Sequence, residues 1–596
     1  MRKILLAGLS ILAFNSAAFA VEPIKWQGWT PDLFQKSSAE KRLVILDMKA
    51  VWCHWCHVME ETTYRDPEVV ELINKHFVAV QVDQDGNPDL SNRYGEWGWP
   101  ATILFAPDGT EIAKLRGYRN PDEFEAILKA FIADPTPGPS VDKRPDIAPA
   151  QSHSLTEVTR NKLKAKWIEA YDKLNGGWGG NQRFIPFGQM EYALALAETG
   201  DATAIQMARQ TLDASLALID PVWGGVYQYS DKPDWSSPHY EKIMSFQAQS
   251  LRSYAQAYRL FGEARYKSAA DAVANYLMDR MRGTEGAFYA TQDADLSSSM
   301  SGKQFYALDA VARDKLGTQP RIDTNLYARE NGMAIEALAG YGLITSNASA
   351  VAAAEKAASW IVANRSIDGG GFSHGAKDRS GPYLGDSLYM SRAALALYAT
   401  TGERQWLVIA GSSAAFIAAT FKATAGFATT KSAESTAVAF SKPIVDPEEN
   451  MELARHFNLL SRYAGLAAFR EQAEHAMKAL ASPQITESRL FLGELLVADQ
   501  ELAIEPVHIT IVGHKDDPAA LRLLEAAHAF PAQYARIDWW DTREGPLVNP
   551  DVTYPDMGEA AAFACSNQIC SQPAFQAAEL TKVVQAMMKL RKVTME

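Results

Sequence analysis

The chain has 596 residues, of which 47% are hydrophobic, 22% are charged and 10% are aromatic. This length exceeds what one hydrophobic core usually organises, and the apolar content excludes a disordered polymer, so we expect two or three folded domains. The chain carries 58 basic and 71 acidic residues, a net charge of −13, and no basic block. These features disfavour binding to nucleic acid or to an anionic membrane, and we expect small molecules or proteins as partners.

Residues 1–20 have the pattern of a signal peptide. Arg2 and Lys3 precede an apolar run at residues 4–14, and residues 18–20, Ala-Phe-Ala, match the small-residue pattern of a cleavage site. The apolar run is shorter than the ~20 residues of a membrane span, so we favour cleavage before Val21 over an uncleaved anchor. We therefore expect an exported protein with no membrane span in the mature chain, periplasmic if the host is a Gram-negative bacterium.

Residues 21–134 alternate between strand and helix patterns. Apolar strand runs at residues 43–48, 78–83 and 102–105, followed by a strand at 111–117, are interspersed with amphipathic helical segments. The order β-α-β-α-β-β-α predicts a thioredoxin fold. The segment 135–153, which is rich in proline, is predicted to be a linker, because proline is excluded from helix interiors and central strands.

Residues 154–500 are helical and repetitive. Turn glycines and glycine-aromatic clusters alternate along this region, and each cluster follows a turn glycine by 24 to 28 residues. The turn glycines are at positions 200, 262, 342 and 402, and the cluster glycines are at 224, 286, 370 and 426. A further turn glycine at 465 and an opening glycine-rich loop bring the count of helical hairpins towards six. We therefore predict a closed (α/α)6 toroid, with an open helical stack as the alternative.

Residues 501–596 return to strand and helix patterns and are predicted to form a small α/β segment. The fold class expected for the chain is multidomain, α/β plus all-α.

The four cysteines form two close pairs, Cys53/Cys56 and Cys565/Cys570. In an exported protein such pairs lie where disulfides form and persist. Cys53 is predicted to end a strand and open a helix, where the partial positive charge of the helix end favours a thiolate and hence a nucleophile. Cys56 lies one turn later on the same face and is predicted to resolve the mixed disulfide.

Two further positions fit this chemistry. Asp47 lies six residues before Cys53 on the entering strand and is predicted to accept the proton of Cys56, although a purely structural buried carboxylate is the alternative. Trp99-Pro100 directly precedes a strand, and a cis peptide there would present the Trp99 backbone to an extended substrate; an ordinary trans proline turn is the alternative.

Two histidines, His54 and His57, flank the second half of the motif. Protonated imidazoles would favour the thiolate and raise oxidising power, whereas solvent-facing histidines would have no tuning role. Both interpretations stay open from the residues alone.

The motifs resemble those of a known family. Asp47, the motif Trp52-Cys53-x-x-Cys56 and Pro100 stand at the spacings of thioredoxins. The longer strings CHWCHVMEETTYRDPEVVELINKHFVAVQVD and GWPATILFAPDG resemble the thioredoxin-domain family that includes spermatogenesis-associated protein 20. The resemblance implies a thioredoxin-like domain joined to a toroid similar to six-hairpin glycosidases and sugar epimerases, and it implies the fold rather than a substrate.

The cysteine motif is also compatible with other chemistries. C-x-x-C-H is also the attachment signature of c-type haem, and Cys53, Cys56 and a histidine could bind zinc. A permanent structural disulfide is a further alternative. We favour redox cycling, with no cofactor and no metal; for Cys565 and Cys570 we consider either a local disulfide or exchange with the first pair.

Five polar residues of the toroid follow its glycine-aromatic clusters and are predicted to gather at one mouth: His239, Glu241, Asp293, Asp295 and Asp386. Paired carboxylates could act as acid and base on a sugar, and the histidine could transfer a proton. The alternative is that these residues cap helices and satisfy loop backbone groups. Phe246 stands where sequences of the resembling family have an aspartate, which argues against an inherited toroid activity.

These patterns together predict an exported thiol-disulfide oxidoreductase that acts on protein thiols or disulfides. The alternatives are a carbohydrate-active toroid with an accessory thioredoxin domain, and a non-catalytic binding protein.

Overall fold

The structure is a computed structural model, and it describes residues 22–141, 146–376, 378, 381–431, 440, 442, 444–489, 491–549, 553–566 and 569–593. The predicted signal peptide lies outside these residues. Among the described helices, none combines the length and the apolarity that crossing a membrane requires. The chain forms two compact units, and each is described by itself.

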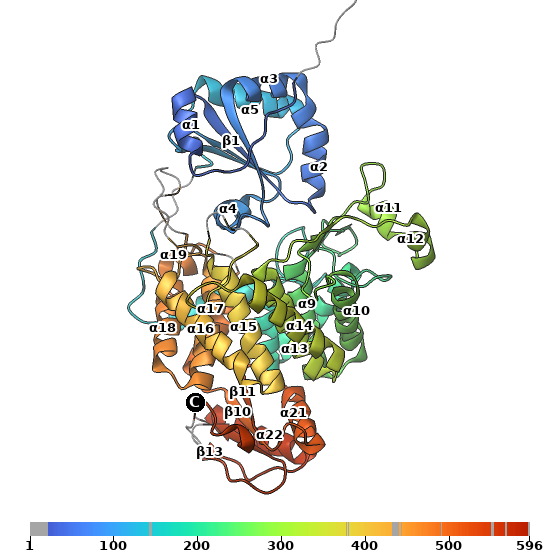
Figure 1. Cartoon of the computed structure of the whole chain (residues 1–596), viewed down its shortest axis with the longest axis vertical. Coiled ribbons are helices and arrows are strands. Elements are labelled where there is room, and N and C mark those ends of the chain that lie inside the picture. Colours follow the sequence, from blue (N-terminus) through green and yellow to red (C-terminus); the bar gives the residue numbers. More distant parts are fainter. Residues whose placement is uncertain are drawn as a thin grey trace, which may run out of the picture. The chain divides into compact units, whose positions relative to one another are not determined.

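The N-terminal unit is built on a four-stranded sheet. Its strands are β1 (Leu43–Lys49), β2 (Phe77–Asp83), β3 (Ala101–Phe105) and β4 (Glu111–Arg116), in the order β2-β1-β3-β4. β3 pairs antiparallel with both β1 and β4. The helices of this region are α1 (Leu33–Glu40), α2 (His54–Glu61), α3 (Pro67–His76), α4 (Pro88–Tyr94) and α5 (Pro121–Ala133) (Figure 1). This is the predicted thioredoxin fold, with one additional helix, α1, before the first strand.

Local sequence explains where these elements begin. The side chain of Asp66 accepts hydrogen bonds from the backbone N–H groups of Glu68 and Val69, and Pro67 occupies the first position of α3, where its missing N–H costs nothing. Asn120 and Pro121 start α5 in the same way. Every residue of β1 between Leu43 and Lys49 is buried, as expected for a central strand covered on both faces.

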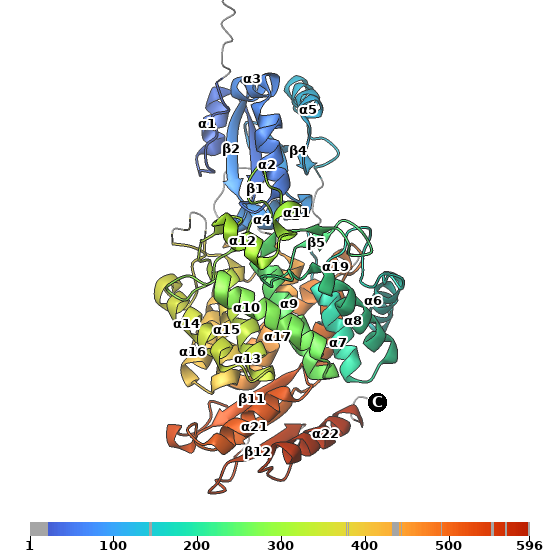
Figure 2. The same cartoon turned by 90° about the vertical axis from the view of Figure 1, so that its right-hand side faces the viewer.

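Twelve helices of the described chain form the predicted toroid. The inner ones are α7 (Phe187–Glu198), α9 (Met244–Phe261), α13 (Ala328–Ile344), α15 (Leu384–Thr401), α17 (Pro447–Ala464) and α20 (Gly493–Ala503). Each inner helix contacts the next, and α20 contacts α7, so the ring is closed. Figures 1 and 2 show helices of this region from two sides.

Six outer helices pack one against each inner helix: α6 (Glu157–Glu169), α8 (Ala202–Ser215), α10 (Ala264–Arg280), α14 (Ala348–Arg365), α16 (Arg404–Thr420) and α18 (Ala467–Leu480). Three short helices lie in the connections: α11 (Gly302–Tyr306), α12 (Ala310–Leu316) and α19 (Pro483–Thr486).

The glycine-aromatic loops share one construction. The fourth residue of an inner helix binds the backbone of the loop before it: Asn331 accepts a hydrogen bond from the N–H of Phe288 at 2.7 Å and donates one to its carbonyl at 2.9 Å. Asn450 holds Phe427 in the same way, at 2.8 Å for both bonds. Gln247 and Ser387 occupy the equivalent position in α9 and α15. These side chains satisfy buried backbone groups that no regular element pairs.

One predicted turn glycine, Gly342, does not lie in a turn. Gly342 lies inside α13, where a Cβ would meet the side chain of Val351 at 2.6 Å, and the turn comes later, at Ser346 with a positive φ of 54°. Gly342 is therefore a close-packing position between α13 and α14. By contrast, Gly224 has a φ of +72° and a Cβ there would lie 2.1 Å from the carbonyl oxygen of Ala272, so this loop requires glycine.

The C-terminal segment contains a second four-stranded sheet. Its strands β10 (Val507–Val512), β11 (Ala535–Trp540), β12 (Ala561–Ser566) and β13 (Ile569–Cys570) lie in the order β11-β10-β12-β13, with helices α21 (Pro518–Ala529) and α22 (Ala577–Val593). β10 is parallel to β11 and antiparallel to β12. The strand order, second-first-third-fourth, is that of the N-terminal sheet, a similarity that the sequence did not suggest.

We expect Asn450→Ala to destabilise the toroid, because the N–H and C=O of Phe427 would both lose a buried partner. The free energy of unfolding should fall by roughly 2–5 kcal/mol, the cost of leaving two buried polar groups unpaired. Urea denaturation followed by circular dichroism measures this loss. The matched control is Asn364→Ala on the exposed face of α14, which should change stability by less than about 0.5 kcal/mol. Equal effects of the two substitutions would contradict the role of Asn450 in holding the backbone of Phe427.

Candidate functional site

The cysteine motif lies where β1 passes into α2. After the strand ends at Lys49, the N–H of Cys53 bonds to the carbonyl of Ala50 at 3.2 Å, and α2 begins at the next residue. Both Cys53 and Cys56 are disulfide-bonded. Since Cys565 and Cys570 are bonded to each other, Cys53 and Cys56 form the remaining pair. The strand-to-helix position expected from the sequence is therefore the observed one.

The surroundings of the motif are aromatic. Cys53 and Cys56 are buried, with exposed fractions of 4% and 2%. Between them, Trp55 is 43% exposed, and its ring lies 5.6 Å from that of Tyr118. Trp55 is visible in the sequence as a large aromatic residue inside the C-x-x-C motif.

Asp47 is held inside the N-terminal unit by two side chains. The hydroxyl of Tyr64 donates to Asp47 Oδ1 and the amide of Gln81 donates to Oδ2, both at 2.9 Å. Asp47 is 1% exposed. Burial and the charge of Asp47 raise the pKa of Tyr64 well above its usual value, so the phenol stays protonated and keeps donating.

Tyr64 and Gln81 are site residues that the sequence analysis missed. Gln81 was detectable as the polar residue of an otherwise apolar strand run, VAVQVD. Nothing in the local pattern indicated that Tyr64, in a 3-10 turn after α2, reaches back to Asp47. The predicted role of Asp47 as proton acceptor of Cys56 stays a prediction.

Pro100 is buried directly before β3, and its carbonyl accepts the N–H of Gly117 at 2.9 Å. In the β1–β3 ladder the next residue, Ala101, lies opposite Met48, so Pro100 sits at the end of β1 that leads into the cysteine loop. The cis peptide between Trp99 and Pro100 stays a prediction. His54 and His57 both lie on α2, and their tuning roles also stay predictions.

In the toroid, the register of a small sheet brings two of the predicted polar residues to the same place. Strand β7 (Lys242–Ile243) pairs antiparallel with β8 (Thr291–Gln292), and Lys242 lies opposite Gln292. Glu241 directly precedes the first and Asp293 directly follows the second. Both carboxylates are buried, with exposed fractions of 3% and 6%.

His239 lies beside two carboxylates. Its Nε2 is 2.6 Å from Asp231 Oδ2, its Nδ1 is 3.8 Å from Glu241 Oε2, and its ring stacks on Tyr229 at 4.3 Å. Burial lowers the pKa of His239, but Glu241 and Asp231 more than offset this, so that the pKa is raised overall. Glu241 and Asp231 therefore favour the protonated form of His239.

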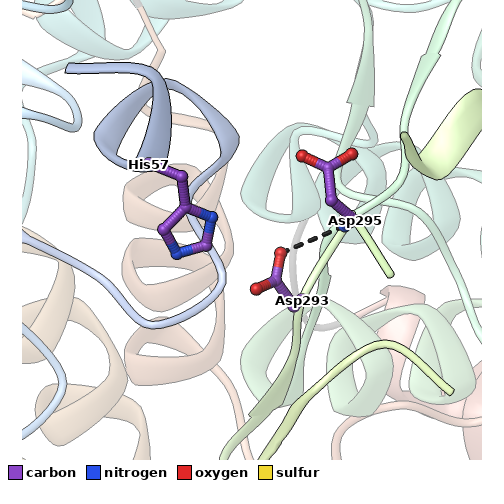
Figure 3. Close-up of side chains that lie close together, drawn as sticks. All are labelled: His57, Asp293 and Asp295. Carbon is purple, nitrogen blue, oxygen red and sulfur yellow. Dashed lines mark hydrogen bonds between the residues drawn. The ribbon is translucent and has the colours of Figure 1, made fainter. Parts of the chain in front are cut away.

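Asp293 and Asp295 organise their own loop, as Figure 3 shows. The N–H of Asp295 donates to Asp293 Oδ1 at 3.1 Å, and Asp295 Oδ1 accepts the N–H of Gly302 at 2.6 Å. These contacts satisfy backbone N–H groups of the loop.

Asp386 lies at the start of an inner helix in a buried polar cluster. Its Oδ1 accepts the backbone N–H of Arg329 at 2.9 Å and lies 2.9 Å from His374 Nδ1. Burial lowers the pKa of His374, but the charge and hydrogen bond of Asp386 raise it to about 9. His374 is therefore an imidazolium at neutral pH, paired with a carboxylate.

Glu449, in the first turn of α17, is the neighbouring acid, because a Cβ at Gly385 would lie 2.6 Å from its Oε1. Burial and Asp446 raise the pKa of Glu449 to about 8, so it is protonated at neutral pH. Glu449 Oε2 and Asp386 Oδ2 are buried and have no hydrogen-bond partner among the described residues. His374, Arg329 and Glu449 were not predicted from the sequence, because the spacing along the chain does not show which inner-helix ends adjoin.

Deeper in the toroid, the ninth residues of five inner helices are charged: Arg252, Glu336, Arg392, Arg455 and Glu501. Arg392 pairs with Glu336 at 2.9 Å and Arg455 with Glu501 at 2.8 Å. Burial raises the pKa of Glu336, but Arg392 and Arg252 lower it to about 2 overall. This ring of ion pairs borders a cavity of about 260 Å³.

The N-terminal part of the chain matches a known protein family. Residues 16–127 match the family Thioredox_DsbH, described as "Protein of unknown function, DUF255". Human spermatogenesis-associated protein 20 is 26% identical over 310 residues, which cover 46% of this chain and 39% of that protein. The chain thus spans about two fifths of the length of such curated relatives.

A solved structure and a plant thioredoxin are each similar to part of the chain. Cellobiose 2-epimerase from Bacillus thermoamylovorans B4167 superimposes with a TM-score of 0.42 and 10% identity over 54% of this chain and 86% of that chain. Thioredoxin H7 of Arabidopsis thaliana is 33% identical over 116 residues, which cover 19% of this chain and 83% of that protein. Through its N-terminal domain, the chain belongs to the thioredoxin family.

Proposed function

We propose that the protein is an exported thiol-disulfide oxidoreductase that acts on protein thiols or disulfides through Cys53 and Cys56. The observation that carries the proposal is the disulfide-bonded pair at the N-terminus of α2 in a thioredoxin fold. The helix end favours a thiolate at Cys53, and a thiolate is the form that attacks a disulfide.

The exchange proceeds in two balanced steps. The Cys53 thiolate attacks one sulfur of a partner's disulfide, which forms a mixed disulfide and releases the other partner sulfur as a thiolate. Cys56 then loses its proton and attacks Cys53 Sγ, which releases the second partner thiolate and closes the Cys53–Cys56 disulfide. Two electrons pass to the partner, and both steps run in reverse when the partner is a dithiol.

In this scheme Asp47 takes the proton of Cys56. Two donors, the Tyr64 hydroxyl and the Gln81 amide, hold its carboxyl group in place. The exposed ring of Trp55 offers the apolar contact that distinguishes a protein partner from a small thiol. Export, proposed from the N-terminal pattern, supplies the compartment in which such disulfides persist.

Replacement of the resolving cysteine tests the proposal. We expect Cys56→Ser to accumulate mixed disulfides with partner proteins through Cys53, because the second step is blocked. Non-reducing electrophoresis and mass spectrometry of the trapped species measure this accumulation. In the control Cys53→Ser/Cys56→Ser the trapped species should disappear, and an empty trap together with failure to reduce insulin would overturn the proposal.

A second prediction concerns Asp47. We expect Asp47→Asn to slow the resolution step by roughly 10²-fold at pH 7, the lower end of what general acid-base catalysis contributes, and to recover as the pH rises and Cys56 ionises unaided. Stopped-flow tryptophan fluorescence across pH 6–10 measures the profile. Asp108→Asn, in an exposed turn of the same domain, is the control and should follow the wild-type profile. A pH-independent loss in Asp47→Asn would indicate a structural role instead.

We infer a second candidate function for the toroid, a carbohydrate-active site at the N-terminal ends of its inner helices. What favours it is the cluster of a protonated acid, Glu449, an ionised pair, Asp386 and His374, and two buried carboxyl oxygens without a partner among the described residues. A protonated carboxyl beside an ionised one is the arrangement that acid-base chemistry on a glycosidic bond or a sugar carbon uses.

The substitution Glu449→Gln tests the electrostatic part of this inference. The folded pKa of about 8 lies above the ordinary value of 4.5, so this group contributes stability that is present below pH 4.5 and is lost as the pH rises to 8. We expect the glutamine variant to lack that loss, which amounts to at most about 1.4 kcal/mol per pH unit. Urea denaturation at pH 5 to 9 measures the difference, and the exposed Glu157→Gln is the control.

The same variant tests the binding part. Monosaccharides and disaccharides that raise the melting temperature of the wild-type toroid should not raise that of Glu449→Gln. Equal protection of both proteins would contradict a carbohydrate site at this end of the inner helices.

A further inference from the structure

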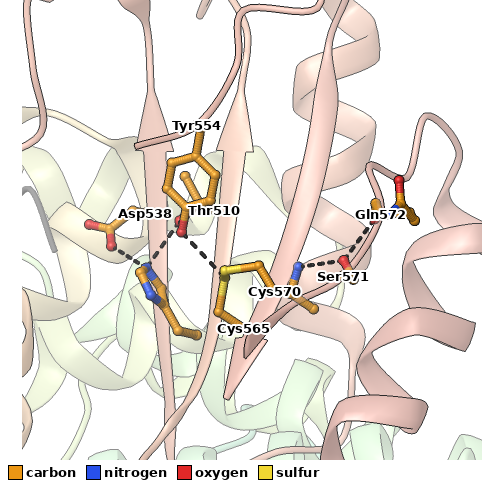
Figure 4. The surroundings of a disulfide bond; sticks show 9 residues. Thr510, Asp538, Tyr554, Cys565, Cys570, Ser571 and Gln572 are labelled. Carbon is orange, nitrogen blue, oxygen red and sulfur yellow. Dashed lines mark hydrogen bonds and ion pairs between the residues drawn. A yellow bond between two sulfur atoms is a disulfide. The ribbon is translucent and has the colours of Figure 1, made fainter. Parts of the chain in front are cut away.

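The C-terminal sheet carries a disulfide for which the proposed function has no use. Cys565 on β12 and Cys570 on β13 lie directly opposite each other in the antiparallel ladder, with their Cα atoms 4.1 Å apart and their sulfurs bonded (Figure 4). A loop this short closes little chain entropy, so the bond contributes less stability than a long-range disulfide would. Its position must be explained in some other way.

The two sulfurs have different surroundings. Cys565 is 4% exposed and lies on an inner strand of the sheet, whereas Cys570 is half-buried on β13, the last strand in the sheet order. Ile569, beside Cys570, is 56% exposed. An incoming thiol therefore reaches Cys570 more readily than Cys565.

The buried sulfur has a hydrogen-bond donor. The hydroxyl of Tyr554 lies 3.7 Å from Cys565 Sγ, and since a disulfide sulfur carries no hydrogen, the phenol is the donor (Figure 4). The same hydroxyl accepts the Thr510 hydroxyl at 2.9 Å, which leaves its own hydrogen for the sulfur. A donor so placed stabilises a thiolate that forms at Cys565.

Polar groups behind Thr510 hold this arrangement in the core of the sheet. His508 Nε2 lies 3.0 Å from Thr510 Oγ1 and 2.9 Å from Asp538 Oδ2, and Arg536 pairs with Asp538 at 2.7 Å. Burial raises the pKa of Asp538, but Arg536 and His508 lower it to about 2 overall, so the carboxylate is charged and anchors the imidazole. The chain of contacts therefore leads to the Tyr554 hydroxyl, a neutral donor that faces the sulfur.

We propose that Cys565–Cys570 is a second redox site, an electron acceptor for a protein dithiol. A thiolate of the dithiol attacks Cys570 Sγ, forms a mixed disulfide there, and expels Cys565 as a thiolate to which Tyr554 donates. The second thiol of the partner loses its proton and attacks the partner sulfur of the mixed disulfide, which releases Cys570. The partner leaves as a disulfide, and two electrons and two protons remain on Cys565 and Cys570.

The order of attack follows from exchange chemistry. The sulfur that leaves faster is the one whose thiolate is better stabilised, and the sulfur that is attacked must be reachable. Cys565 meets the first condition and Cys570 the second. An edge strand also offers backbone groups to an extended segment of the partner, which would align its cysteine with Cys570.

The test uses the full chain carrying Cys53→Ser and Cys56→Ser, so that its result is independent of the function proposed for the N-terminal pair. In this background we expect dithiothreitol, without denaturant, to reduce Cys565–Cys570 and expose two alkylatable thiols, counted by mass spectrometry. A bond that opens only when the chain unfolds would overturn the proposal and indicate a structural disulfide.

The rate of reduction of the Cys565–Cys570 disulfide tests the role of Tyr554. Tyr554→Phe should slow reduction by dithiothreitol roughly 3- to 10-fold, because the leaving thiolate loses its donor. The control is Tyr398→Phe, which removes the 2.8 Å hydrogen bond from Tyr398 to Asp538 but leaves the sulfur's donor in place, and it should stay within about 2-fold of the parent. Equal slowing in both variants would contradict a specific role for Tyr554.

Single-cysteine variants test which sulfur is attacked. With Cys565→Ser, glutathione disulfide should modify Cys570 at least 10-fold faster than it modifies Cys565 in Cys570→Ser. The reverse order would overturn the assignment of the attacked sulfur, even in a protein whose disulfide is reducible.

Discussion

The unpaired N–H groups at the beginning of a helix are the feature on which both candidate sites depend. An α-helix leaves its first N–H groups without intrahelical acceptors, and the chain must satisfy them or use them. In the N-terminal domain, Cys53 lies between the end of strand β1 and the beginning of α2, where the partial positive charge of the helix end favours a thiolate. In the toroid, the inner helices begin at one end of the ring, and Asp386 and Glu449 lie in their first turns. Reactive groups therefore gather where helices start.

In the toroid, polar side chains recur at the same two positions of the inner helices. Fourth residues such as Asn331 and Asn450 bind the preceding loops, while ninth residues such as Arg392 and Glu336 pair between neighbouring inner helices. Loops so anchored can carry polar residues without losing their backbone hydrogen bonds. The buried charges are compensated by each other, which keeps the interior polar without leaving an isolated ion.

The two sheets of the chain have the same strand order but place their cysteines differently. In the first sheet, Cys53 and Cys56 lie at a helix N-terminus. In the second sheet, the corresponding strand β10 leads to α21 through a segment without cysteine. The second cysteine pair, Cys565 and Cys570, instead joins β12 to β13. The helix dipole that acts on the first pair is thus absent from the second, where the phenol of Tyr554 is the donor. One topology accommodates two means of stabilising a thiolate.

Much of the architecture could be predicted from the sequence, because local patterns determine it. The period of the apolar residues, the caps at Asp66 and Asn120 and the spacing of the glycines depend on neighbours along the chain, and they indicated the thioredoxin fold and the helical ring. Gly342 was misassigned because a packing glycine and a turn glycine look alike in sequence. Only the tertiary structure decided which distant side chains meet: Tyr64 and Gln81 on Asp47, His374 beside Asp386, Tyr554 beside Cys565. These contacts join residues from separate elements, and the closure of the ring and the register of the sheets, which no short segment specifies, bring them together.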